Sequence, residues 1–273
     1  YANTTGVSNT AIGHTALYTN TTASNNTAVG GAALLVNTAG HSNTAVGSRA
    51  LDANTTADDN TAVGYNALSD NTTGIQNVAV GSRTLDANTS ADGNTAVGYL
   101  AMTVNTTGAS NTAVGSLSLD ANTTGDTNAA LGYASLGANT TGDNNTAVGY
   151  HALLSNTTAE QNTAVGSWSL DANTTGSNNT GIGIGSLGAN TTGTQNTALG
   201  AVALLVSTTA SHNAAVGYGA LQNTTTGQNN AAVGSLSHDN LTTGSNNIAI
   251  GYNTASSAVG VDSEIVIGPS VTG

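Results

Sequence analysis

The chain has 273 residues and a net charge of −12, and only 6% of its residues are charged, against about 25% in a typical globular domain. It contains two Lys or Arg residues, so its composition excludes nucleic acid and anionic membrane surfaces as partners, because both require clustered basic side chains. No apolar run approaches the roughly 20 residues that cross a bilayer, and the absence of Cys excludes disulfides as a source of stability.

A 17-residue phrase repeats along the whole chain. It reads NTAVGYNALSDNTTGIQ from Asn60 and begins again at Asn77 and at Asn94. When the leading Asn is numbered position 1, position 5 is Gly in sixteen successive copies, from Gly13 to Gly268, without an insertion. The unit is too short for a helix pair or a propeller blade, and its Gly, Asn and Thr disfavour helix. The sequence therefore predicts an all-β fold, a parallel β-solenoid (β-roll) of about sixteen coils with one coil per repeat.

We expect a single solenoid domain over residues 1–273, with a partial coil at 1–8 and repeats in register from 9 to 273. Neighbouring strands lie about 4.8 Å apart, so each position forms a column of like residues along the stack. One coil alone buries too little apolar surface to fold, and stability must come from stacked neighbours. The chain starts at Tyr1 without a signal-peptide pattern, so we expect a processed product or an excerpt of a longer shaft.

The first predicted element of each coil is a strand at positions 1 to 5. Strand side chains alternate between faces, and position 4 is aliphatic in every copy, so we expect position 4 to point into the coil. Position 3 is then expected to point outward, yet it is almost always Ala. Such restriction on an outer face indicates that another chain packs against it. The predicted subunit interface comprises Ala28, Ala45, Ala62, Ala79, Ala96, Ala113, Ala147 and Ala164.

The second predicted element is a short strand at positions 8 and 9, where Leu closes the core. Gly at positions 5 and 15 is expected to form corners with positive φ. Asn at position 1 is expected at a bend, where stacked side chains bond to one another and to the backbone. The predicted core residues are Val29, Val46, Val63, Val80, Leu51, Leu68 and Leu85.

The last predicted element is an Asn-Thr-Thr loop at positions 12 to 14, and its motif has two interpretations. Each copy fits the Asn-x-Ser/Thr acceptor pattern for N-glycosylation. Alternatively, Asn and Thr are simply good turn formers that stack well. The predicted glycosylation residues are Asn54, Asn71, Asn105, Asn122, Asn139, Asn173 and Asn190.

Threonine columns are also typical of ice-binding solenoids, in which rows of hydroxyl and methyl groups order water. The Thr row at position 14 is the candidate for such a face. It includes Thr22, Thr56, Thr73, Thr107 and Thr124.

Aromatic residues recur at position 6, which alternates between Ser and Tyr over residues 48–133 and indicates a duplicated 34-residue ancestor. Two interpretations apply to Tyr65, Tyr99, Tyr133, Tyr150 and Trp168: contact with a receptor or glycan, or packing over the corner.

Catalytic patterns are absent from the sequence. The five His residues are scattered over different positions. Asp52, Asp86 and Asp120 at position 10 recur every second coil, about 10 Å apart, too far to share a calcium ion. We interpret these carboxylates as solubilising charges. We therefore predict no enzyme activity, and no catalytic, cofactor-binding or metal-binding residue.

The strand segments NTAIG, NVAVG, NIAIG and SEIVIG resemble the S-V-A-I-G strand of the YadA-like head repeats of trimeric autotransporter adhesins, and related repeats of trimeric phage tail fibres. The resemblance extends from Asn9 to Gly268, although this repeat is longer than theirs. It implies a left-handed β-roll, three chains side by side, and a location outside the cell, at the cell surface or on a virion fibre. On that analogy the Val29 column fills each roll and the Ala28 column faces the threefold axis.

We therefore expect a structural extracellular fibre or adhesin shaft whose main partner is itself, as a side-by-side trimer and an end-to-end filament. A surface glycan or receptor is a further expected partner, and no membrane insertion or cofactor is expected. The alternative prediction is an ice-binding β-solenoid that uses Thr columns.

Overall fold

A computed structural model of the chain describes residues 2–268. The chain forms two compact units, Tyr1–Thr141 and Gly142–Gly273, and each continues the same 17-residue repeat. The single domain expected over 1–273 stays a prediction. Residues 269–273 of the predicted last coil lie outside the described part of the chain.

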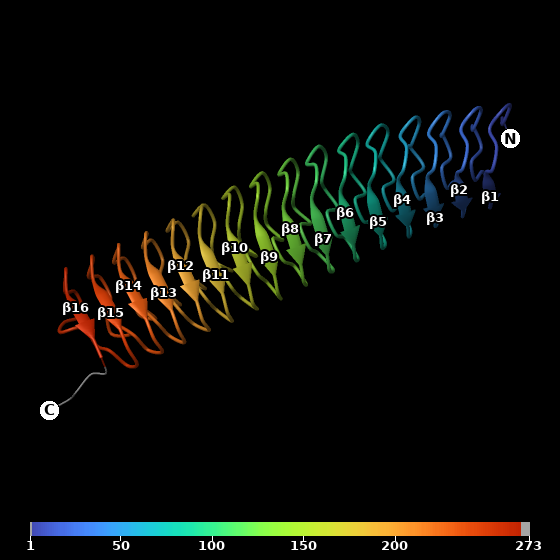
Figure 1. Cartoon of the computed structure of the whole chain (residues 1–273). Coiled ribbons are helices and arrows are strands. Elements are labelled where there is room, and N and C mark those ends of the chain that lie inside the picture. The colour runs from blue at the N-terminus through green and yellow to red at the C-terminus, as the bar shows by residue number, and fades with distance from the viewer. Residues whose placement is uncertain (1, 269–273) are drawn as a thin grey trace. The chain divides into compact units, whose positions relative to one another are not determined.

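Each coil of the first unit contributes one three-residue strand at positions 2 to 4. The strands pair in parallel and in chain order, with every residue opposite its counterpart one repeat away, as in Ala28 and Ala45 of β2 and β3 (Figure 1). The strands are β1 (Thr10–Ile12), β2 (Thr27–Val29), β3 (Thr44–Val46), β4 (Thr61–Val63), β5 (Val78–Val80), β6 (Thr95–Val97), β7 (Thr112–Val114) and β8 (Ala129–Leu131).

The second unit repeats this arrangement. Its strands also pair in parallel without a register shift, as in Ala147 and Ala164 of β9 and β10. They are β9 (Thr146–Val148), β10 (Thr163–Val165), β11 (Thr180–Ile182), β12 (Thr197–Leu199), β13 (Ala214–Val216), β14 (Ala231–Val233), β15 (Ile248–Ile250) and β16 (Ile265–Ile267). The prediction of an all-β parallel solenoid with one 17-residue coil per repeat is confirmed.

The strand faces are the reverse of the prediction. The Ala column at position 3 lies inside its own coils, and the predicted subunit interface is wrong because these methyl groups are 0% exposed within one chain. The correction applies to Ala28, Ala45, Ala62, Ala79, Ala96, Ala113, Ala147 and Ala164.

The aliphatic column at position 4 points outward instead of into the core. Val46 is 37% exposed, and Val29, Val63 and Val80 are half-buried. Their assignment to the core is therefore wrong. Alternation along a strand separates position 3 from positions 2 and 4, but it does not say which set faces inward.

The width of the coil explains why Ala takes the inner face. At Gly181, which occupies position 3 of β11, a Cβ atom would lie 2.7 Å from Ser169 Oγ and 3.0 Å from Ser186 Oγ. Position 3 thus faces position 8 of the same and neighbouring coils across very little space. A Val side chain there would overpack the interior.

The Leu column at position 9 fills the remaining apolar interior. Leu51, Leu68 and Leu85 are 0% exposed, which confirms their assignment to the core. The second strand predicted at positions 8 and 9 is wrong, because these residues form turns and Leu51 has a φ of 52°. A left-handed Leu costs of order 1 kcal/mol, and its burial contributes about 1.5–3 kcal/mol, so packing outweighs the strain.

The corner at position 5 requires glycine, as predicted. Gly64 has a φ of 141°, and a Cβ atom there would lie 2.2 Å from the carbonyl oxygen of Gly81 in the next coil. At position 15 the prediction is wrong, since glycines such as Gly40 and Gly74 are not among the residues with positive φ. Positions 7, 9 and 17 take the left-handed conformation instead, mostly without glycine.

Two columns of Asn line the interior beside the Leu. At position 12, Asn54 Nδ2 donates to Asn37 Oδ1 in the preceding coil (2.8 Å) and to its own coil at Ala57 O (3.1 Å). At position 1, Asn43 Oδ1 accepts from the backbone of Asn60 (2.9 Å), and Asn43 Nδ2 also reaches Ala57 O (2.8 Å). Each coil is thus closed by two amides on one carbonyl, and both columns tie it to its neighbours. The stacked Asn bonding expected at position 1 is confirmed.

Candidate functional site

The predicted glycosylation residues lie in the position 12 ladder and are 0% exposed. Asn139 Nδ2, for example, donates to Asn122 Oδ1 (2.9 Å), and Nδ2 is the atom that would carry a glycan. The buried nitrogen has no room for a sugar, so the glycosylation interpretation is contradicted by the folded structure. This holds for Asn54, Asn71, Asn105, Asn122, Asn139, Asn173 and Asn190.

The two Thr columns beside this ladder differ in what their hydroxyls do. At position 13, Thr106 Oγ1 donates to the Thr123 carbonyl oxygen of the next coil (3.0 Å), which ties neighbouring coils together. At position 14, Thr73 and Thr107 are exposed, but they lie in a bent segment outside the strands. The position 14 row therefore does not form the flat strand surface that ice binding requires.

A flat outer surface does exist on the strands, at positions 2 and 4. In the first unit this surface, the outer strand face, carries a row of Thr such as Thr44 and Thr95 beside the aliphatic row. Ile12 is 60% exposed and Leu131 is 50% exposed. The second unit has a corresponding face, with Leu199 44% exposed. No residue of these strands is charged.

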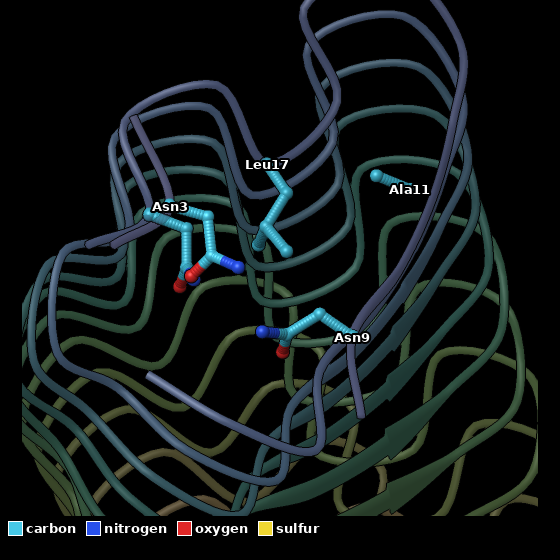
Figure 2. A pocket seen from close by; sticks show the side chains of 5 residues that line it. Asn3, Asn9, Ala11 and Leu17 are labelled. Atoms are coloured by element: carbon cyan, nitrogen blue, oxygen red, sulfur yellow. The ribbon is translucent and has the colours of Figure 1, made fainter. Parts of the chain in front are cut away.

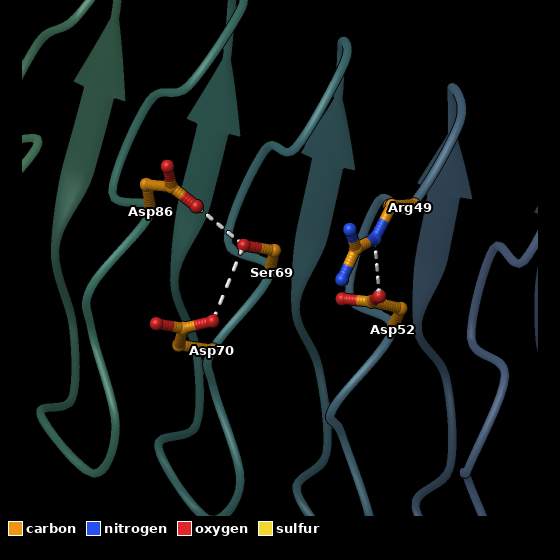
Figure 3. A network of polar contacts seen from close by, with 5 residues as sticks. All are labelled: Arg49, Asp52, Ser69, Asp70 and Asp86. Carbon is orange, nitrogen blue, oxygen red and sulfur yellow. Dashed lines mark hydrogen bonds and ion pairs between the residues drawn. The ribbon is translucent and has the colours of Figure 1, made fainter.

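The only Lys or Arg residues of the chain, Arg49 and Arg83, lie two coils apart in the first unit, each beside an acid of its own coil. Figure 3 shows Arg49 with Asp52. Arg49 Nε donates to Asp52 Oδ2 at 2.9 Å, and Arg83 Nε lies 3.6 Å from Asp86 Oδ2. In the coil between them, the Ser69 hydroxyl donates to Asp86 and its oxygen lies 3.5 Å from Asp70 Oδ1. Hydrogen bonds thus join the second and third of these coils, and charge interactions with Asp70 add the Arg49–Asp52 pair of the first coil to one polar network.

Charges in this network shift one another. The pKa of Asp70 is raised by loss of hydration first, and then by the charges of Asp86 and Asp52. Asp52 raises the pKa of Arg49 through the hydrogen bond and its charge, with smaller contributions from Tyr65 and Asp70. Both guanidinium groups remain more than half exposed, at 59% and 55%, so their ion pairs contribute little stability.

Burial alone raises the pKa of two other position 10 acids, Asp120 and Asp171. Each carboxylate also accepts backbone hydrogen bonds, which act in the opposite direction. Both acids are half-buried.

The aromatic residues at position 6 form an exposed column beside the corner. In the first unit Tyr65 is 53%, Tyr99 56% and Tyr133 46% exposed. In the second unit Tyr150 stacks on His151 with ring centres 3.9 Å apart and meets Trp168 edge-on at 5.6 Å. About half of the surface of each of these Tyr residues is therefore exposed.

His238 is the one His that lies in the core, at position 9 where other coils have Leu. It is 0% exposed and neither ring nitrogen has a hydrogen-bond partner. Burial lowers its pKa, and the charge of Glu264 opposes that shift. Over residues 2–268, no three His, Cys, Asp or Glu side chains converge on a point that would hold a metal ion.

A cavity of about 220 Å³ opens at the first coils of the first unit (Figure 2). Its walls are Asn3, Asn9, Ala11, Leu17 and Asn20, and the Asn and Leu side chains point inward from the coil, as Figure 2 shows. These residues belong to the same Asn, Ala and Leu columns that fill the interior elsewhere. The cavity therefore lies among the columns that pack the interior, with no additional chemistry of its own.

Sequence reasoning missed three features: the inward Asn ladder, the inward Ala column and the network around Arg49. Both Arg residues of the chain have an Asp three positions later, in Arg49–Asp52 and Arg83–Asp86. This shared spacing was the signal in the sequence that could have predicted the two contacts.

Comparison with protein-family models and with curated proteins finds no match to this chain. In the described residues there is no helix of the length and apolarity that would span a membrane.

Proposed function

We propose that this chain is a structural protein that self-associates side by side into an extracellular fibre or adhesin shaft. The observation that carries the proposal is the outer strand face, which in each unit has an aliphatic side chain at position 4 of every strand. Exposed contiguous apolar rows of this kind mark interaction surfaces in soluble proteins. The face is uncharged on a chain of net charge −12, so association there brings the fewest like charges together.

The partner that fits this face is another copy of the same chain. Its aliphatic side chains recur once per coil, about every 4.8 Å, and a second copy presents a row with the same spacing and no charge. Aliphatic rows with equal spacing can interdigitate along their whole length. The predicted self-association is thus retained, but the interface moves from the Ala column to the Val column.

The finer parts of the proposal come from the resemblance to YadA-like head repeats and phage tail fibres. They are a left-handed roll, a trimer around a threefold axis and a location outside the cell or on a virion. The proposal also includes growth end to end, because every coil pairs in register with a copy of the same repeat, and an unpaired coil edge is a template for a coil of another chain. The proposed role is mechanical, without catalysis.

The test is to place charges on the outer strand face of the full chain. We expect Val63→Glu with Val97→Glu to reduce the mass in sedimentation velocity from that of an oligomer to that of one chain, because paired faces would bury the new carboxylates. The matched control is Thr73→Glu with Thr107→Glu, which puts the same charges on exposed sites of the same two coils. A wild-type chain that stays monomeric, or a control that dissociates equally, contradicts the proposal.

Ice binding is the second candidate, and one observation favours it. Thr at position 2 and an aliphatic residue at position 4 flank the inward Ala on most strands of the first unit, so hydroxyl and methyl groups form parallel rows on a flat sheet. This hypothesis predicts thermal hysteresis that is lost in Thr44→Tyr with Thr95→Tyr and kept in Thr73→Tyr. The fibre proposal predicts no thermal hysteresis in any of these proteins.

A further inference from the structure

An evenly spaced row of exposed aromatic rings lies on the first unit outside the outer strand face. Strand pairing aligns Val63, Val80, Val97, Val114 and Leu131 in one column. Each ring of the row follows one of these residues by two positions, on every second strand. The row consists of Tyr65, Tyr99 and Tyr133.

The spacing of this row suits a particular polymer. Two coils rise about 9.6 Å, which is close to the length of two pyranose rings joined by β-1,4 linkages in an extended chain. The intervening position 6 residues are Ser82 and Ser116, whose small side chains leave the space between the rings open. Each Tyr ring would therefore meet every second sugar of a chain that follows the stack of coils. Flat aromatic rings present a rigid apolar surface with little entropy to lose, and the C–H face of a pyranose ring is complementary to it.

Hydrogen-bonding groups surround the first ring of the row. Arg49 and Arg83 occupy position 7 of the coils on either side of Tyr65, and their contacts to Asp52 and Asp86 go through Nε. Both Arg side chains are more than half exposed, and guanidinium N–H donors beside an aromatic ring can serve the hydroxyl groups of a sugar.

The charge around Tyr65 selects among polymers. Arg49 and Arg83 lie beside Asp52 and Asp86, and Asp70 adds a third carboxylate near Asp86, as Figure 3 shows. With a net charge of −12, the chain would repel uronic acid or sulfated polymers. A neutral polysaccharide carries no such penalty.

We propose that the row of Tyr65, Tyr99 and Tyr133 binds a neutral, extended β-1,4-linked polysaccharide along the stacking direction of the first unit, with Arg49 and Arg83 as its polar anchor. The proposal does not depend on self-association, because the Tyr row is separate from the outer strand face. It adds a ligand class to a scaffold that is otherwise structural.

The experiment is calorimetric titration of the full chain with cellohexaose and, separately, with chitohexaose, the two arms that distinguish glucose from N-acetylglucosamine polymers. We expect at least one of them to bind. Tyr99→Ala should then weaken binding about tenfold through loss of one stacking surface, and Tyr99→Trp should retain it. Tyr18→Ala is the matched control, since Tyr18 is 51% exposed but lies at position 10, outside the row at position 6. The Tyr18→Ala variant should bind the hexaose with the affinity of the wild type.

Three outcomes would overturn the proposal: no binding of either hexaose, equal binding of the α-1,4-linked maltohexaose, or tighter binding of polygalacturonate. Equal weakening by Tyr18→Ala would also refute the role of the row. Sedimentation of the same Tyr variants should show the wild-type mass. That measurement separates failure of this proposal from failure of the self-association proposal.

Discussion

In the first unit, position 12 is Asn in every coil from Asn3 to Asn139, and most of these amides have ladder bonds. Near the end of the second unit the same position holds other residues, namely Ser207, Thr224, Leu241 and Ala258. The position 1 column behaves differently, since Asn247 Nδ2 still bonds to Asn230 Oδ1 (3.0 Å). Coil stacking therefore persists without the position 12 ladder, and the position 1 column and the strand pairing suffice to keep the register.

The late coils also exchange polar and apolar residues within one layer. In the coil that starts at Asn230, position 9 is His238 instead of Leu and position 12 is Leu241 instead of Asn, and both are 0% exposed. The exchange keeps the total volume similar, but it leaves two imidazole nitrogens without partners. We infer that the first unit is the more stable region and that the late coils open first.

The largest expected effect comes from breaking the intact ladder. Asn105→Ala removes the bonds from Asn105 Nδ2 to Asn88 Oδ1 (3.1 Å) and to Gly108 O (2.9 Å), and it leaves Asn122 Nδ2 without its ladder acceptor. Buried groups left unpaired cost about 1–3 kcal/mol each, so we expect a loss of about 2–6 kcal/mol in urea unfolding.

The comparison variant in the late coils is Thr224→Ala, at the same repeat position. Thr224 Oγ1 makes one bond, to Leu241 O at 3.1 Å, so the expected loss is only about 1–2 kcal/mol. If both variants cost the same, the ladder has no special role.

The next effect is a gain in the late coils. His238→Leu replaces two unpaired ring nitrogens by the residue that fills position 9 elsewhere, and we expect about 1–3 kcal/mol of added stability. Leu221→Val in the preceding coil is a control for general repacking and should destabilise. A less stable His238→Leu protein would show that the imidazole has partners in solution.

The same variant changes the pH dependence of unfolding. The pKa of His238 is lowered in the folded chain, so below the ordinary His value near 6.5 the unfolded chain binds more protons and stability falls as pH falls. Asp70, Asp120 and Asp171 have raised pKa values in the folded chain. The folded chain therefore binds their protons first as pH falls, and these three groups add stability in that range. The difference between wild type and His238→Leu isolates the His: it should grow from pH 7.5 to pH 5.5. A constant difference would contradict this account.

The smallest effect is an extension of the ladder by one step. Asn190 Oδ1 and Ser207 Oγ are both buried without partners. Ser207→Asn would supply a donor to Asn190 Oδ1, and we expect a gain of about 1 kcal/mol. Ser207→Ala serves as the control, because it removes one unpaired group without pairing Asn190. A gain from Ser207→Ala that equals the gain from Ser207→Asn would show that no ladder bond forms.

The repeat and the parallel register follow from the sequence because Gly at position 5 recurs without an insertion, and from Gly13 to Gly115 each such Gly has backbone of the next coil where a side chain would be. Leu68 and its column were also predictable as core, because a large apolar residue recurs at position 9 in nearly every coil. The sequence did not predict which face of each strand points inward. A period of two divides Thr-Ala-Val into two sets, and only the narrow interior at positions 3 and 8 decides that Ala faces inward.

The Asn ladder was hidden for a different reason. Asn-Thr-Thr is typical of turns, and the motif contains no sign that the amide is inside. Burial of this side chain is favourable only when its amide is fully hydrogen-bonded. Asn37 Nδ2, for example, donates to Gly40 O in its own coil and to Asn20 Oδ1 in the preceding coil, and the second bond exists only because the coils stack. The Arg49–Asp52 contact and the unpaired oxygen of Asn66 likewise depend on how turns at positions 7 to 10 fold back.

The central claim is that the Asn side chains of position 12 lie inside the coils as hydrogen-bonded ladders. Hydrogen exchange of side-chain amides, followed by NMR in deuterated water, tests it most directly. The account predicts a large group of Asn Nδ2 hydrogens that exchange far more slowly than exposed amides and that shrinks in Asn105→Ala. Exchange of all Asn side chains at the rate of exposed amides would contradict it.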